Sequence, residues 1–195
     1  MGYLEILGVA LSLVYVFLMM RQNIWCWFFG ILGSLLSIAI FIDAKLYSES
    51  ILYAFYVAVG IYGWVKWHTK DHRGIPIKKW GIINHLATIV AGGLGALGLG
   101  YFFSTQSDAE SPFYDASTTS FSFVASFLEA HKILSGWIYW IVLNMMTIYL
   151  YASKEIYMYA AYSGVLTILS VIGFLRWQSA YKAQASADIY FEELK

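Results

Sequence analysis

The chain is short of charge, cysteine and proline. Only 12% of its 195 residues are charged, whereas a soluble globular domain averages about 25%. Basic and acidic residues balance at 12 each, so no overall field attracts nucleic acid and no nucleic-acid partner is expected. A single cysteine, Cys26, excludes an internal disulfide. Because 60% of the residues are hydrophobic, these shortages place the chain in the membrane class, with the lipid bilayer as its surroundings.

Long apolar runs follow one another along almost the whole sequence. A membrane-spanning helix needs about 20 largely apolar residues, and alternating strand patterns are missing, so we predict an all-α membrane protein with seven transmembrane helices. The first run has no basic segment before it and no small-residue cleavage site, and we expect it to be retained as a helix. The predicted spans lie near residues 3–20, 24–42, 50–67, 84–103, 115–130, 133–152 and 156–176.

The basic residues are distributed unevenly between the two sides of this predicted bundle. With the N-terminus outside, only Lys45 and Lys154 lie in outer loops, and every other Lys and Arg falls in inner loops or the tail. Positive charge collects on the cytoplasmic side of membrane proteins. We therefore expect the N-terminus outside and the C-terminus in the cytoplasm.

The second part of the sequence repeats the first. Each matching residue lies the same number of positions further along the chain, the distance from Trp67 to Trp177, and we call this distance the repeat shift. The segment "IYGWVKW" then falls on "VIGFLRW", so that Trp67 matches Trp177, and Trp27 matches Trp137. Trp67 and Trp177, each beside a basic residue, are typical of anchors at the inner membrane interface. Two three-helix repeats joined by one helix predict a 3+1+3 arrangement of parallel repeats, as in SWEET transporters. The expected divisions are a first repeat (1–69), a loop and connecting helix (70–110), a second repeat (111–178) and a cytosolic tail (179–195).

The sixth predicted span carries an unusual polar stripe. Trp137, Trp140 and Asn144 follow helical spacing along one face, and Thr147 and Tyr151 extend it. A carboxamide near the centre of the membrane is costly unless it faces protein or a cavity. An interhelical hydrogen bond would satisfy Asn144 equally well, and Trp137 could belong to an interfacial aromatic belt. The combination of indoles and amide favours a pocket for a flat, polar, aromatic solute.

The matching positions in the first repeat are small. Gly30 and Ser34 stand where the second repeat has Trp140 and Asn144, so large rings would face a smooth surface across a slot. A flat ring could stack there, and Tyr62 and Trp64 from the third span could reach it. We predict a substrate site made of these residues and the stripe on the sixth span.

The sequence lacks the residues that several kinds of chemistry require. No ionisable side chain occupies the centre of a predicted span, whereas coupled carriers usually place one there, so we expect uncoupled, facilitated diffusion. His68 and His72 are four residues apart in a basic loop without a carboxylate partner, which favours a solvated loop over a metal site. We found no phosphate-binding loop or catalytic triad, and we expect no cofactor, no metal and no enzymatic activity.

Four short motifs point to a family. The segments "RQNIWCWFFGILGS", "YGWVKW", "WIYWIVLN" and "YASKEIY" together resemble the nicotinamide riboside transporter (PnuC) family of bacteria, over about residues 3–178. The resemblance implies a SWEET-like fold in the bacterial inner membrane, a homotrimer, and facilitated uptake of nicotinamide riboside for NAD biosynthesis, with trapping by a cytosolic riboside kinase. Carried over by motif, Trp140 and Asn144 are the first substrate residues, and Trp137, Tyr151 and Trp64 are secondary.

Other functions stay open at this point. Thiamine is also a cationic heterocycle, and thiamine or riboflavin uptake would fit the same stacking argument. A membrane-embedded enzyme or a structural subunit is an alternative of another class. An enzyme would gather polar groups at one interface, whereas this polar stripe lies at mid-depth.

Overall fold

The computed structural model describes residues 3–43, 47–68, 75–106, 112–153, 155 and 157–193. Within these residues the chain forms seven α-helices and no strand, which confirms the predicted all-α class. The loop residues Lys45, His72 and Lys154 lie outside the described residues. The helices are α1 (Tyr3–Met20), α2 (Trp25–Asp43), α3 (Tyr47–Trp67), α4 (Ile82–Gln106), α5 (Pro112–Ala130), α6 (Gly136–Ser153) and α7 (Tyr157–Glu193).

Three of the described helices are long and apolar enough to cross a membrane by composition alone. They are Trp25–Asp43, Ile82–Thr105 and Tyr157–Ala187, and a shorter apolar helix covers Ile6–Met20. Helix α5 carries many hydroxyls, and α6 carries indoles, phenols and an amide among its apolar residues. Polar groups inside a membrane need partners within the protein, so internal contacts are expected on these two helices.

The chain forms two compact units. The first comprises residues 1–78, 130–132 and 172–195, and the second comprises residues 79–129 and 133–171. Each unit therefore combines segments that are distant in sequence. The division into repeats that the sequence predicts follows the chain instead, and it stays a prediction.

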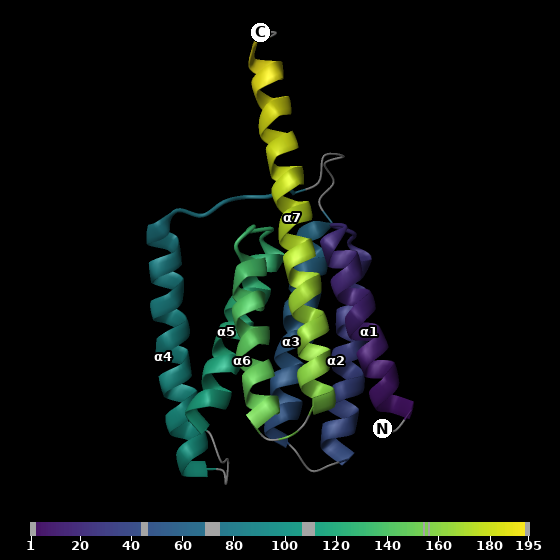
Figure 1. Cartoon of the computed structure of the whole chain (residues 1–195), viewed down its shortest axis with the longest axis vertical. Helices are drawn as coiled ribbons and strands as arrows, with labels where there is room; N and C mark the ends of the chain where they lie inside the picture. The colour runs from purple at the N-terminus through teal and green to yellow at the C-terminus, as the bar shows by residue number, and fades with distance from the viewer. Residues whose placement is uncertain are drawn as a thin grey trace. The chain divides into compact units, whose positions relative to one another are not determined.

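In the first unit, α2 packs between α1 and α3 (Figure 1). Gly63 on α3 makes this approach possible, because a Cβ atom there would lie within 2.6 Å of ring atoms of Trp27. Trp27 is only 2% exposed. Its ring meets Tyr15 edge-on with centroids 6.2 Å apart, and Trp67 with centroids 5.5 Å apart. An aromatic cluster thus fills the space that the missing glycine side chain leaves.

In the second unit, α5 packs closely on α4. The hydroxyl of Ser120 donates to the carbonyl of Gly92 at 2.8 Å, and a Cβ atom on Gly92 would lie 2.7 Å from the ring of Phe121. Glycines allow this kind of close approach between helices in a membrane. The Tyr114 hydroxyl donates to the carbonyl of Met146 on α6. The hydroxyls that make α5 weakly hydrophobic therefore include two that bond neighbouring helices.

Helix α7 continues well beyond the last predicted span. It runs unbroken for 37 residues to Glu193, so the predicted cytosolic tail begins as a continuation of the membrane helix. Gln184 fastens this extension to the loop before α4, because its side-chain Oε1 accepts a hydrogen bond from the backbone N–H of Ile77 at 3.2 Å.

The two indoles predicted as interface anchors lie elsewhere. Trp67 is 8% exposed and Trp177 is fully buried, and their rings approach each other with centroids 6.3 Å apart. Both belong to the core of the first unit, so the anchor interpretation is wrong. An interfacial indole keeps its N–H in water or among headgroups, whereas these two donate to backbone carbonyls inside the protein.

Candidate functional site

Helix α6 separates its side chains into two faces. Trp137 and Asn144 are buried, at 2% and 8% exposure, and Trp140 is half-buried. The apolar residues of the other face are exposed, and they are Ile138, Val142 and Met145, with Tyr149 beside them. The polar stripe therefore faces protein while the aliphatic face is free to meet lipid, which is the cheaper arrangement in a membrane.

The polar atoms of the stripe are incompletely bonded. The indole Nε1 of Trp140 is buried, and it has no hydrogen-bond partner among the described residues. The amide Nδ2 of Asn144 donates to Ser170 Oγ on α7 at 3.5 Å, which is at the outer limit for a hydrogen bond. A buried N–H without an acceptor is costly. One turn of α6 thus holds an unpaired donor and a weakly held amide.

Thr147 and Tyr151, further along the stripe, are engaged locally. The Thr147 hydroxyl donates to the backbone carbonyl of Asn144 at 2.9 Å, so its proton is already used. The half-buried Tyr151 packs against Tyr159 on α7, with ring centroids 5.6 Å apart. These two positions can bound a site, but their present contacts are with the protein itself.

The predicted site residues of α2 and α3 have different surroundings. Ser34 is buried on α2. Tyr62 is 44% exposed, and its hydroxyl lies 3.1 Å from His131 Nε2 and accepts a hydrogen bond from Lys66 Nζ at 3.2 Å. Trp64 meets the ring of Trp25 edge-on with centroids 5.5 Å apart. Tyr62 is therefore occupied by a polar cluster at the end of α3.

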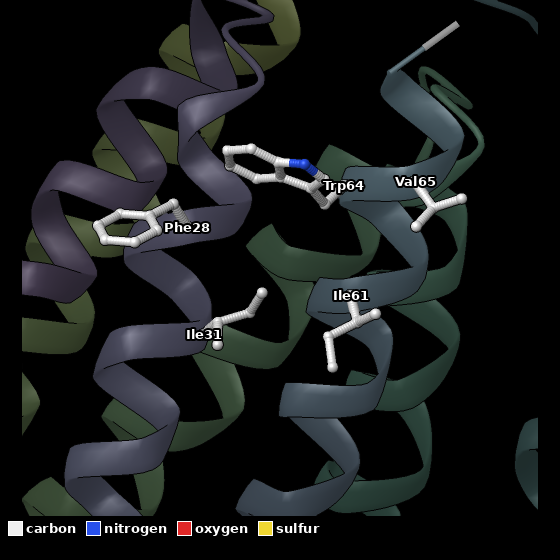
Figure 2. Close-up of a pocket in the computed structure, with 5 residues that line it drawn as sticks. All are labelled: Phe28, Ile31, Ile61, Trp64 and Val65. Atoms are coloured by element: carbon white, nitrogen blue, oxygen red, sulfur yellow. The ribbon is translucent and has the colours of Figure 1, made fainter.

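An apolar pocket lies on the first unit between α2 and α3. Figure 2 shows Phe28 and Ile31 on one helix and Ile61, Trp64 and Val65 on the other, with the indole of Trp64 reaching across. Its cavity volume is about 280 Å³. Its lining side chains are hydrocarbon except for the indole N–H of Trp64, so the pocket has no acceptor or amide for a polar solute.

The structure brings Trp137, Trp140, Asn144, Thr147 and Tyr151 together on the second unit, whereas Ser34, Tyr62 and Trp64 belong to the first. The slot between the two sets stays a prediction.

Sequence reasoning missed Ser170, which holds the Asn144 amide, because one serine in an apolar run carries no signal. It also missed the aliphatic lining of the α2–α3 pocket, because aliphatic residues within a predicted membrane span look the same whether they face a pocket or lipid. Among the described residues, no group of three or more His, Cys, Asp or Glu could hold a metal ion.

Comparisons with known proteins give the geometry its context. The profile of the family described as "Nicotinamide mononucleotide transporter" matches residues 2–179. The "Nicotinamide riboside transporter PnuC" of Escherichia coli (strain K12) is 22% identical over 216 aligned residues, covering 95% of this chain and 89% of the relative. The protein of the same name from Shigella flexneri matches equally well.

A solved structure shares the fold. The "Crystal structure of the Vitamin B3 transporter PnuC" has a TM-score of 0.76 and 21% sequence identity, covering 93% of this chain and 83% of that one. The relatives are named as transporters, which agrees with the prediction that this chain is not an enzyme. A profile matching residues 2–179, relatives matching almost end to end and a common seven-helix fold together show that the chain belongs to the nicotinamide mononucleotide transporter family of bacterial membrane proteins.

Proposed function

We propose that this chain carries nicotinamide riboside across the membrane by facilitated diffusion, with Trp140 and Asn144 as its principal binding residues. The observation that carries the proposal is the buried, unpaired indole N–H of Trp140, one helical turn from the weakly bonded amide of Asn144. Relatives that match nearly the whole chain are named nicotinamide riboside transporters. A solute that supplies hydrogen-bond acceptors would remove the cost of leaving the indole N–H unbonded and would strengthen the bonding of the amide.

The chemistry of nicotinamide riboside suits this stripe. Its cationic aromatic ring can stack on an indole, which is worth about 1–3 kcal/mol for a base on an aromatic side chain. The attraction of a cation to the ring face adds about 0.5–2 kcal/mol. The carboxamide and ribose hydroxyls of the solute can pair with Asn144 and accept from Trp140 Nε1. Trp137, Thr147 and Tyr151 would bound the site on α6, while Ser34, Tyr62 and Trp64 remain sequence-based predictions for the same substrate.

Titration of purified protein followed by indole fluorescence tests this site. We expect nicotinamide riboside to quench the fluorescence, and Trp140→Ala to weaken binding about 5- to 150-fold, the equivalent of a lost stack. Tyr149→Ala is the aromatic control on the same helix, because Tyr149 is 73% exposed. Met145→Ala, at 58% exposure, is the control for Asn144→Ala. Equal binding by Trp140→Ala and the wild type would contradict the proposed site.

The same titration separates the alternative solutes and classes. Tighter binding of thiamine or riboflavin would reassign the substrate within the transporter class. A structural role predicts that Trp140→Ala and Asn144→Ala lower the amount of folded protein in the membrane, whereas a transport role predicts normal abundance with lost uptake.

Uncoupled transport is supported by the span centres, which lack ionisable side chains in the sequence. Proteoliposomes loaded with no solute should take up radiolabelled nicotinamide riboside to equilibrium and no further. Protonophores and sodium gradients should leave the initial rate unchanged. Accumulation above the outside concentration without any internal enzyme would show coupling.

The remaining proposals concern the cellular arrangement. We propose a homotrimer, a cytoplasmic C-terminus, and trapping of the riboside by a cytosolic kinase that phosphorylates it. Light scattering of the detergent-purified protein measures the first, and the activity of a phosphatase fused after residue 195 measures the second. For the third, kinase and ATP sealed inside the proteoliposomes should convert equilibration into accumulation.

A further inference from the structure

The turns after α1 and α5 have the same backbone form at positions related by the repeat shift. Asn23 N–H donates to Leu18 O at 3.0 Å, and Ile133 N–H donates to Leu128 O at 2.9 Å. The residue before each donor has a left-handed backbone, with φ of 55° at Gln22 and 52° at Lys132. This bonding closes a helix in a Schellman motif, where glycine usually occupies the left-handed position. A long side chain at this position projects from each turn.

Two indoles, also related by the repeat shift, bond the ends of these helices. Trp67 at the end of α3 donates through Nε1 to Ala130 O at the end of α5, at 3.0 Å. Trp177 of α7 donates to Met19 O near the end of α1, at 3.1 Å. The last carbonyls of a helix have no partner within it. Each predicted repeat therefore caps a helix end of the other, through an equivalent residue.

The two left-handed residues complete the contact. Lys132 Nζ donates to Gln22 Oε1 at 3.2 Å and lies 4.5 Å from the ring centroid of Trp67. Lys132 is only 7% exposed. We call Gln22, Lys132, Trp67 and Trp177 the indole junction, and all four lie within the first unit.

The junction is held by a charge that is only partly compensated. An ammonium buried beside a neutral amide and a ring face keeps less stabilisation than it has in water, because burying an ion costs more than one such hydrogen bond returns. Burial accordingly lowers the pKa of Lys132 to about 8. Water entering the junction would recover the hydration energy of the ammonium. The contact is closed in this structure, and the charge at its centre favours opening.

We propose that the indole junction is a gate that must part during each transport cycle, with Lys132 as the charge that keeps its closed state from becoming too stable. The proposal rests on the transport function above, and the SWEET-like repeat supplies two bodies that could move about such a contact. The capping hydrogen bonds give the closed state its geometry, and the buried ammonium limits its stability.

Two variants should hold the gate closed. Lys132→Met keeps the stem on Trp67 without the charge, and Gln22→Glu places a carboxylate opposite the ammonium. We expect each to raise the midpoint of thermal unfolding and to slow nicotinamide riboside uptake into proteoliposomes at least fivefold. Binding measured by indole fluorescence should stay within twofold of the wild type. Lys182→Met, which removes an exposed lysine of α7, is the matched control and should change neither property.

The outcomes are distinct. Raised stability with uptake at the wild-type rate would show that the junction is a permanent tie, and would overturn the proposal. An unfolding midpoint unchanged in both variants would overturn it also, because the charge would then not limit the closed state. If the wild type fails to bind nicotinamide riboside, the substrate proposal fails. The gate is then tested on the wild type, whose single cysteine, Cys26, is fully buried and interacts electrostatically with Lys132: measurable labelling of Cys26 by an impermeant maleimide supports opening, and none refutes it.

Discussion

Replacing Gly63 by alanine should break the packing of α3 on α2. The added Cβ would lie within 2.6 Å of ring atoms of Trp27, where an ordinary carbon contact is about 3.5–4.0 Å. The indole is 2% exposed and lies against both Tyr15 and Trp67, so it has little room to move. Overpacking of this kind costs about 1–3 kcal/mol.

The matched control is Gly98→Ala on α4, where an added Cβ meets no atom within 4 Å. Both variants gain about 1 kcal/mol of helix propensity, so their difference isolates the clash. A difference of about 1–3 kcal/mol corresponds to roughly 2–12 °C in the midpoint of thermal unfolding for a chain of this size. Circular dichroism of both proteins in detergent measures it. Equal midpoints would refute the argument that Trp27 is fixed in place.

Three further predictions concern single contacts. The pKa of Lys132 falls from 10.5 to about 8 on folding, so the unfolded chain binds more protons between these values and stability rises with pH across them. The full rise in the free energy of unfolding is on the order of 3 kcal/mol. Unfolding midpoints compared from pH 7 to 10.5 should show this rise in the wild type and not in Lys132→Met. Ser120→Ala removes the hydrogen bond to Gly92 O and should cost about 0.5–1.5 kcal/mol of unfolding free energy; no loss would mean that this bond adds nothing. Tyr62→Phe breaks an exposed cluster, so stability should change by less than about 0.5 kcal/mol, and a larger loss in chemical denaturation would contradict the surface placement.

Much of the fold was accessible from the sequence because lipid restricts the backbone so strongly. Apolar runs of about 20 residues can only be helices there, and the helices begin and end within a few residues of the predicted spans, except at the end of α7. That exception has a physical cause. The segment after Gln178 is rich in good helix formers and follows a formed helix, so it propagates without a new nucleus. Hydropathy marks where apolar sequence stops, and it carries no information about where a helix stops.

The candidate site was predictable only in part. Helical spacing alone placed Trp137, Trp140 and Asn144 on one face, and burial of that face agrees. The misread indoles, Trp67 and Trp177, show the limit of such patterns. Tryptophan beside a basic residue near a span end fits an interfacial anchor and a buried cap of another helix equally well. The difference depends on carbonyls of α5 and α1, which lie far from these indoles in sequence, and no local pattern reports such a partner.

The uninterrupted length of α7 has a mechanical consequence. At 1.5 Å per residue, its 37 residues extend about 55 Å, whereas the hydrocarbon layer is about 30 Å thick. Several turns must therefore stand clear of the acyl chains as a stiff rod. A small tilt at the embedded end is magnified into a displacement of several ångströms at the far tip. A spectroscopic label on the exposed turns would thus read out movements too small to follow within the bilayer.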